Sequence, residues 1–246
     1  MKWGFFSITH IISLIVGVGI IVGLYFILRN KSQKTQIITL GILSFSGIAA
    51  IIYNLVAWNS PLEYLPLHLC SLNALILPIT VLTKNKILGN VLSVWCLGAL
   101  FALIVNSAMA ETEIFSWQFF FYYFPHVLEF GIPILLFAFG LIEKDVKCIF
   151  TTVGITMVIY TIIHFINLGL NNYFIENNIL DYAGNVLQVN YMFSIKPENP
   201  LLDLFYKVIP YKYWYMYLII PILVIYLSII YFPQIKIIIQ RKNTQN

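Results

Sequence analysis

The stretch Ile11-Ile-Ser-Leu-Ile-Val-Gly-Val-Gly-Ile-Ile-Val-Gly-Leu-Tyr-Phe-Ile-Leu28 decides the fold class of this chain. It completes a run without Asp, Glu, Lys or Arg that starts at Trp3. That run exceeds the roughly 20 residues needed to cross a hydrocarbon core about 30 Å thick. It is too long for the apolar part of a signal peptide, and no small-residue cleavage site follows it. The run therefore predicts a retained first transmembrane helix.

The composition of the whole chain agrees with this first helix. Of the 246 residues, 60% are apolar and 10% are charged, and the mean hydropathy is +0.87. Further apolar runs predict an all-α polytopic membrane protein with seven transmembrane helices in a single domain, residues 1–246. The expected spans are about 3–28, 37–58, 65–83, 87–110, 119–142, 148–170 and 214–233. A connection at about 171–213 has room for structure outside the bilayer, and residues 201–209 within it predict a short amphipathic helix in the interface.

Basic residues gather in alternate connections of this seven-helix arrangement. Ten of the fourteen Lys and Arg residues lie in the first, third and fifth connections and at the C-terminus: Arg29, Lys31, Lys34, Lys84, Lys86, Lys144, Lys147, Lys236, Arg241 and Lys242. By the positive-inside rule this side is cytoplasmic, so the N-terminus and the 171–213 connection are expected outside the cell membrane and the C-terminus inside. The basic residues do not form a patch with interleaved aromatic residues, which argues against nucleic-acid binding.

Polar residues mark the start of the third span, in Tyr64-Leu-Pro-Leu-His-Leu-Cys-Ser-Leu-Asn73. Polar groups are costly in hydrocarbon, so they indicate a functional site by default. With the predicted topology, and a rise of about 1.5 Å per residue, the four histidines and Cys70 all fall within roughly 10 Å of the outer surface. The layer comprises His10, His68, Cys70, His126 and His164, and is extended by Asn106, Ser107 and Glu129. A single histidine at an interface is usually a packing residue; the shared depth across four helices favours a common pocket.

Cys70 is the candidate nucleophile of this layer, because the start of a helix favours a thiolate. His68 is two residues away and points to a different side of the helix, so His126 is the better candidate base. Glu129 lies three residues after His126 on the same face, where it could orient the ring. Asn73, on the face of Cys70, or Asn106 could donate to a developing oxyanion. The plainer alternative is that Cys70 is a small packing residue and Glu129 is hydrogen-bonded within the helix bundle.

Several motifs resemble a known family. They are Leu65-Pro-Leu-His-Leu-Cys-Ser-Leu-Asn-Ala-Leu75, Tyr123-Phe-Pro-His-Val127, Asn190-Tyr-Met-Phe-Ser194, Lys196-Pro and Trp214-Tyr. Together they resemble the bacterial YwaF-like integral membrane proteins, which are related to the eukaryotic transmembrane protein 164 acyltransferases. The resemblance implies a bacterial plasma-membrane protein and a Cys- and His-dependent transfer of acyl chains onto phospholipids. It implies catalytic roles for Cys70 and His126, and it adds Asn190 and Tyr191 as positions of a family motif.

Three classes of function follow. The first is lipid acyl transfer, with Cys70, His126 and Glu129 catalytic, and with His68, Asn73, Asn106, His164, Asn190 and Tyr191 binding phospholipid or lyso-lipid substrates. The second is a transporter or ligand-binding membrane protein with an outward-facing polar pocket and no catalysis. The third is a metal site from His68, His126, Glu129 and His164, whose ligand types would suit zinc or iron. No metal-binding spacing on one helix supports this third reading, so no metal and no cofactor are expected. Cys96 and Cys148 lie at other depths, which predicts three free thiols.

Overall fold

The computed structural model describes residues 1–58, 60–105, 109–181 and 183–243. Nearly all of its regular structure is helical, and the described residues form no strand. The helices are α1 (Ile8–Leu28), α2 (Gln33–Ser44), α3 (Ser46–Ala57), α4 (Leu69–Thr83), α5 (Lys86–Ile104), α6 (Trp117–Ala138), α7 (Cys148–Glu176), α8 (Pro200–Val208) and α9 (Ile219–Asn243), with 3-10 turns η2 (Tyr191–Phe193) and η3 (Trp214–Leu218). The predicted all-α class is confirmed.

Side chains at the helix starts explain several of these boundaries. The oxygen atoms of Ser7, Ser32, Asn85, Ser116 and Asn199 each accept a hydrogen bond from the main-chain N–H three residues later. Each bond satisfies one of the N–H groups that have no partner in the first turn of a helix. The chain thus marks the starts of α1, α2, α5, α6 and α8 locally.

Within the described ranges, six helical segments are long and apolar enough to cross a membrane: α1, α2 with α3, α5, α6, α7 and the η3–α9 segment. The seventh predicted span corresponds to α4, which is apolar but has only 15 residues. It begins at Leu69, because the predicted start at residue 65 lies in an irregular segment that leads from α3. The seven-span count, and the orientation of the chain in the membrane, stay predictions.

Other boundaries also differ from the sequence prediction. Residues before Ile8 turn away from the helix, with Gly4 and Phe6 at positive φ, and Trp3 N–H donates to Thr112 O. The second predicted span divides near Phe45, where Ser44 Oγ donates to Gly41 O at 2.6 Å, a contact that bends helices. The helix α5 ends at Ile104 rather than near residue 110, and α7 runs to Glu176 rather than to 170.

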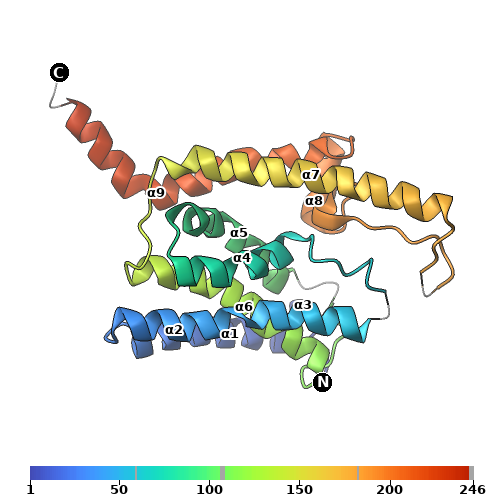
Figure 1. The fold of residues 1–246 in the computed structure, drawn as a ribbon, viewed down its shortest axis with the longest axis horizontal. Coiled ribbons are helices and arrows are strands. Elements are labelled where there is room, and N and C mark those ends of the chain that lie inside the picture. The colour runs from blue at the N-terminus through green and yellow to red at the C-terminus, as the bar shows by residue number, and fades with distance from the viewer. Residues whose placement is uncertain (59, 106–108, 182, 244–246) are drawn as a thin grey trace.

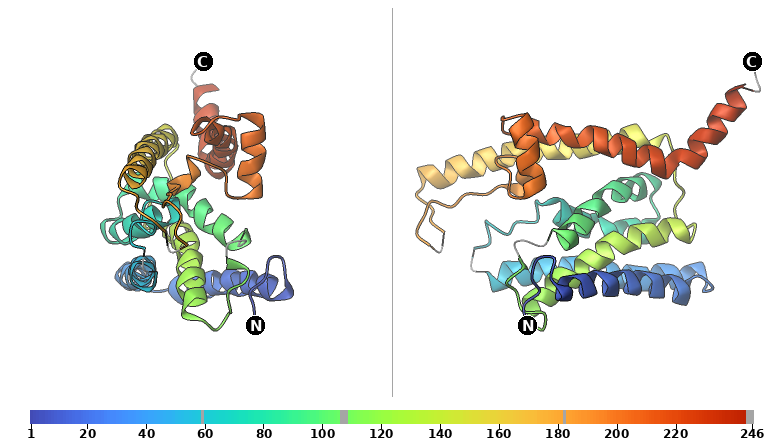
Figure 2. Two further views of the ribbon diagram at one scale, coloured as in Figure 1. Left: turned by 90° about the vertical axis from the view of Figure 1, so that its right-hand side faces the viewer. Right: turned by 180° about the vertical axis from the view of Figure 1, so that it is seen from behind.

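The helix α6 is the centre of the bundle and contacts α1, α2, α3, α4 and α5. Its inner face contributes Leu128, Ile132 and Leu135 to a core with Leu77 and Leu92. In Figure 1, α1, α2 and α3 lie on one side of α4 and α5, whereas α7 and α9 cover the other side. The end-on view in Figure 2 agrees, and α9 packs on α5 and α7 through Leu223, Leu227 and Tyr231. The fold therefore holds α4 between two layers of helices.

The basic connections meet at one end of this bundle, on the left in Figure 1. Asn90 Nδ2 donates to Glu143 O at 3.2 Å, and Asp145 pairs with Lys86 at 2.6 Å. The ring of Tyr25, near the end of α1, stacks on Phe139 at 5.7 Å. The same end thus collects the α1–α2, α4–α5 and α6–α7 connections, as the alternation of charge predicted.

The connection between α7 and α9 folds back onto the bundle. Its helix α8 confirms the amphipathic helix predicted over 201–209, with Leu202 and Phe205 buried against Tyr215. Residues Met192 and Phe193 adopt positive φ, which is unusual for side chains of this size and persists only where neighbouring groups hold the backbone. Tyr215 OH donates to Phe193 O, and Tyr213 N–H donates to Ser194 O at 2.8 Å. These contacts fix residues 190–194, which we call the return segment.

Candidate functional site

The structure brings Cys70, His126 and Glu129 into one cluster. Cys70 lies in the first turn of α4, and His126 and Glu129 lie three residues apart on α6. The Cys70 Sγ, one imidazole nitrogen and one carboxylate oxygen all lie within 4.8 Å of one another. The sequence placed these three residues in one relay, and the fold supplies the proximity that such a relay requires. Their catalytic roles stay a prediction.

One hydrogen bond defines the state of the imidazole. His126 Nδ1 lies 2.6 Å from Tyr122 O, and a carbonyl oxygen only accepts, so Nδ1 carries the hydrogen. In the neutral ring the lone pair is then on Nε2. The Tyr122 ring also packs against the imidazole in a tilted arrangement, with the ring centroids 4.4 Å apart, and its hydroxyl donates to Ala102 O at 2.9 Å. Tyr122 thus orients His126 and leaves Nε2 free to accept a proton or to bind a cation.

Glu129 is buried, with 3% of its surface exposed. Within the part of the chain that the structure describes, its Oε2 has no hydrogen-bond partner, which is costly for a buried carboxyl group. A Cβ built on Gly47 of α3 would lie 2.7 Å from Glu129 Oε1, so the absence of a side chain at Gly47 leaves space for the carboxyl group. A buried carboxyl group without a partner is a common sign of a functional site.

Asn73 connects α4 to the same part of α6. Its Nδ2 donates to the main-chain carbonyl of Glu129 at 3.3 Å. Pro133 lies four residues after Glu129 and has no N–H, so the carbonyl has no helical partner there. Asn73 replaces this missing helical bond, while its buried Oδ1 has no partner in the described ranges. The predicted role of Asn73 as an oxyanion donor would therefore rest on the second hydrogen of the same amide.

The start of α4 offers donors that the sequence analysis missed. His68 is the N-cap residue, and no side chain caps the helix. The first main-chain N–H groups of a helix have no internal partner, so those of Leu69, Cys70 and Ser71 are candidate oxyanion donors beside the thiol. Gly98 of α5 faces this turn, because a Cβ there would lie 3.9 Å from Cys70 Sγ. The expected three free thiols are confirmed.

The other histidines have different surroundings. His10 is fully buried, with Nδ1 accepting from Phe6 N–H and Nε2 donating to Leu103 O, so both ring nitrogens are satisfied. The ring of His68 packs against the rings of Tyr191 and Phe193 in the return segment, with ring centroids 5.4 and 5.6 Å away. His164 belongs to a separate group around Ser194. His68 and His164 are thus not part of the cluster that forms. The three side chains whose possible metal-ligand atoms lie together are those of Cys70, His126 and Glu129.

The return segment is held by polar residues of α7. Asn167 is fully buried and bonds both main-chain groups of Tyr191, at 2.8 and 3.0 Å, and Ser194 Oγ at 2.9 Å. His164 Nδ1 lies 3.0 Å from the same Ser194 Oγ. Asn167 was missed by the sequence analysis, although an amide within the long apolar run of α7 is itself a signal.

Asn190 and Tyr191, the two positions of the family motif, stabilise this same segment. Asn190 Nδ2 donates to Lys196 O and Glu198 Oε1, and Tyr191 OH donates to Leu62 O. Their polar atoms therefore bind other parts of the protein, and the predicted substrate-binding roles of Asn190, Tyr191, His68 and His164 stay predictions. Asn106 and Ser107 lie outside the described residues.

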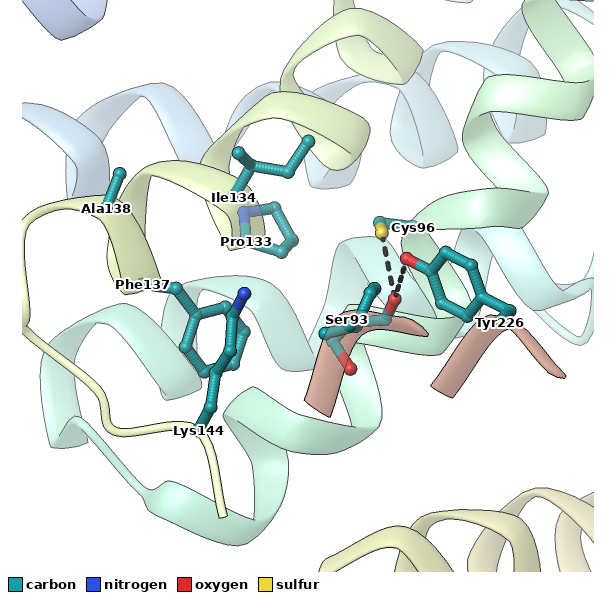
Figure 3. Close-up of a pocket in the computed structure, with 9 residues that line it drawn as sticks. Ser93, Cys96, Pro133, Ile134, Phe137, Ala138, Lys144 and Tyr226 are labelled. Atoms are coloured by element: carbon teal, nitrogen blue, oxygen red, sulfur yellow. Dashed lines mark hydrogen bonds between the residues drawn. The ribbon is translucent and has the colours of Figure 1, made fainter. Parts of the chain in front are cut away.

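Among the described residues, cavities lie between the helices, and two of them bear on the site. One, of about 240 Å³, is lined by Ser93, Cys96, Pro133, Phe137, Lys144 and Tyr226, among others (Figure 3). There Cys96 Sγ and Tyr226 OH both donate to Ser93 O, so this thiol has a structural partner. The other cavity, of about 200 Å³, is an apolar slot between α1, α5 and α6, lined by Leu14, Gly17, Val18, Ile21, Leu100, Leu103, Ile104, Tyr123, Val127 and Phe130. It reaches residues 123 and 127, which flank His126 along α6.

Comparison with known proteins tests the family resemblance. Residues 5–231 match the TMEM164 family. The match includes α1 to α8, most of α9 and all three members of the Cys70, His126 and Glu129 cluster. No curated protein and no solved structure matches the chain.

Proposed function

This chain belongs to the TMEM164 family, and we propose that it transfers fatty acyl groups between membrane lipids through a thioester on Cys70. The observation that carries the proposal is the shared position of the Cys70 thiol, the His126 imidazole and the Glu129 carboxyl group, within 4.8 Å of one another. A thiol beside a base that is itself oriented by other groups is the arrangement of covalent acyl-transfer catalysis. The substrates would be phospholipids and lyso-lipids of the bacterial plasma membrane.

In the first half-reaction, His126 Nε2 takes the proton of the Cys70 thiol, and the sulfur attacks the carbonyl carbon of an ester in a donor phospholipid. A C–S bond forms, the ester C–O bond breaks, and the departing lyso-lipid oxygen receives the proton from His126. In the second half-reaction, the hydroxyl group of an acceptor lyso-lipid gives its proton to His126 and attacks the thioester. The C–S bond breaks, and the sulfur regains its proton.

The surroundings of the cluster suit this chemistry. The carbonyl oxygen of the substrate becomes negative in each step, and the uncapped N–H groups at the start of α4 would stabilise it. Glu129 would balance the positive charge that His126 gains when it takes a proton. The apolar slot that α6 lines with Tyr123 and Val127 suits a hydrocarbon chain better than a polar solute, which favours a lipid substrate over the alternative of solute transport or binding.

The direct test is capture of the acylated thiol. Purified protein in lipid nanodiscs would be incubated with a phospholipid that carries a labelled acyl chain, then digested and analysed by mass spectrometry. We expect a hydroxylamine-sensitive label on the peptide of Cys70, and transfer of the label to an added lyso-lipid. His126→Gln should slow the transfer by roughly 10²- to 10⁴-fold, the usual contribution of a general base.

Matched variants separate catalysis from folding. Cys70→Ser changes one atom and should abolish both the adduct and the transfer, whereas Cys96→Ser should preserve both, because Cys96 donates only to Ser93 O. Size-exclusion profiles would show that each variant is folded. Transfer by Cys70→Ser at the wild-type rate would refute the thioester route, and a well-folded wild type that moves no label from any of several donors would favour the binding or transport alternative.

A further inference from the structure

The same cluster has the composition of a metal site. It supplies a thiol sulfur, an imidazole nitrogen and a carboxylate oxygen, which are the three ligand types that zinc binds in proteins. From this geometry and the unsatisfied groups around it, we propose that Cys70, His126 and Glu129 bind a divalent transition-metal ion of the zinc class. Such a site has three protein ligands and an open fourth position, unlike the closed four-ligand sites that only stabilise a fold.

The spacing of the ligand atoms is close to what such an ion requires. Bonds of about 2.0 to 2.3 Å in a tetrahedral arrangement place two ligand atoms roughly 3.5 Å apart. The three atoms here lie within 4.8 Å of one another, so side-chain movements of about an ångström would bring them to the spacing of a tetrahedral site. Cys70 comes from α4 and the other two ligands from α6, and these helices pack directly on each other.

Two buried atoms point to a missing partner in addition to the ligand set. Glu129 Oε2 and Asn73 Oδ1 are both buried and have no hydrogen-bond partner among the described residues, and the two residues are 3% and 0% exposed. Both oxygen atoms are hydrogen-bond acceptors. A cation would therefore be a favourable neighbour for them, whereas another acceptor would not. A thiolate and a carboxylate together carry two negative charges, and a divalent ion neutralises both within an apolar bundle. On binding, the thiol proton of Cys70 would leave to solvent.

The hydrogen bond of His126 prepares the ring for a metal. Imidazoles that bind metals almost always donate their second N–H to a carbonyl or carboxylate, which fixes the ring and its tautomer. The bond from His126 Nδ1 to Tyr122 O is of this kind and leaves Nε2 for the ion.

Metal binding and the thioester reaction would use the same lone pair of His126. The metal-bound protein therefore cannot use His126 as a base, and we expect zinc to inhibit acyl transfer. This inhibition rests on the proposed function, whereas the binding itself does not.

The test measures bound metal directly. Protein purified with a chelator would be dialysed against micromolar zinc chloride, washed, and assayed for zinc by mass spectrometry. We expect one ion per chain for the wild type and for Cys96→Ser. Cys70→Ser and the near-isosteric Glu129→Gln should each weaken zinc binding by roughly tenfold or more, as loss of metal-site groups typically does. Cobalt chloride should give the thiolate charge-transfer absorption with the wild type and none with Cys70→Ser.

A second readout does not depend on variants. Zinc should protect Cys70 of the wild type from a maleimide and leave the labelling of Cys148 unchanged. An absence of bound zinc in the wild type, or equal zinc content in all variants with no cobalt–thiolate absorption, would overturn the proposal. Acyl transfer by a metal-free protein that never binds zinc would refute the metal site alone. Zinc binding without any labelled thioester would refute the proposed function alone.

Discussion

The side-chain amide of Asn73 donates to the main-chain carbonyl of Glu129 across 56 residues of sequence, at 3.3 Å. Glu129 is thereby fixed from two directions, by its place on α6 and by α4. Pro133 creates the need for this bond, because it removes the helical donor for that carbonyl. The position of the buried carboxyl group next to Cys70 thus depends on an Asn and a Pro that do not belong to the cluster.

A double-mutant cycle would measure this dependence. Asn73→Ala leaves the Glu129 carbonyl unpaired, so we expect it to reduce the free energy of unfolding by about 1–3 kcal/mol. In a Pro133→Ala background, the N–H of Ala at position 133 can donate to the Glu129 carbonyl. Asn73→Ala should then reduce the free energy of unfolding clearly less than it does in the wild type. Thermal unfolding in detergent of the wild type, the two single variants and the double variant measures the coupling energy between Asn73 and Pro133. Purely additive effects of the two substitutions would disprove this coupling.

Gly47 should not tolerate a methyl group. A Cβ there would lie 2.6 Å from Ala74 Cβ and 2.7 Å from Glu129 Oε1, so Gly47→Ala should destabilise the protein by about 1–3 kcal/mol through overpacking. The matched control is Gly19→Ala on α1, where nothing lies within 4 Å of the new atom. There the higher helix propensity of Ala should leave stability unchanged or slightly raised. Equal melting temperatures for the two variants would show that α3 shifts without cost.

Asn167 should control the order of the return segment. Asn167→Ala removes its bonds to Tyr191 and Ser194, so main-chain amides of residues 190–194 should exchange hydrogen for deuterium faster. Asn177→Ala is the control, because that exposed side chain donates to Tyr173 O, one turn earlier, and not to the return segment. Unchanged exchange in Asn167→Ala would mean that the remaining contacts, such as those of Tyr213 and Tyr215, hold the segment without Asn167.

The Lys86–Asp145 ion pair should make stability dependent on acid. The ammonium group of Lys86, the N–H of Lys147 and their positive charges lower the pKa of Asp145. Because the folded pKa lies below the unfolded value of about 3.9, the paired carboxylate stabilises the fold above that value, and the effect is lost as the pH falls through the folded pKa. Asp145→Asn should therefore melt below the wild type at pH 7, and the difference should shrink as the pH falls through the lowered pKa of Asp145. A difference independent of pH would assign the effect to packing.

The orientation in the membrane follows from charge alone and can be measured. A reporter enzyme active only in the cytoplasm should be active when fused after residue 246 and inactive when inserted after Gly184, in the connection expected outside. If the Gly184 insertion is active, the predicted orientation or the predicted number of spans is wrong. The prediction that the four histidines share one depth near the outer surface would then be wrong as well.

Hydropathy was sufficient to predict the helical class, most spans and the amphipathic α8, because these depend on residues close in sequence. Helical spacing also placed His126 and Glu129 on one face, and depth matched them to Cys70. The start of α4 at Leu69 was predicted four residues too early, because the apolar residues 65–67 pack as an irregular segment that hydropathy cannot distinguish from a helix.

Contacts between distant segments were beyond such reasoning. No local pattern indicates that residues 190–194 return to Asn167, or that Gly47 faces Glu129, because both depend on how whole helices pack. The partner of the Glu129 carbonyl could be predicted only in part. Pro133 indicates from the sequence that this carbonyl lacks its helical donor, but only the folded structure identifies Asn73 as the donor that replaces it.

The bond from Tyr191 to Leu62 O has a consequence for biogenesis. Its two ends are 129 residues apart. At roughly 5–20 residues per second, the ribosome completes Tyr191 some 6 to 26 seconds after Leu62. Throughout that interval the segment leading to Cys70 is already made, while the hydroxyl that anchors it has not yet been synthesised. The start of α4, where Cys70 lies, is thus among the last parts of the bundle to be closed, and a chain truncated before residue 191 would lack the anchor of the segment that leads to it.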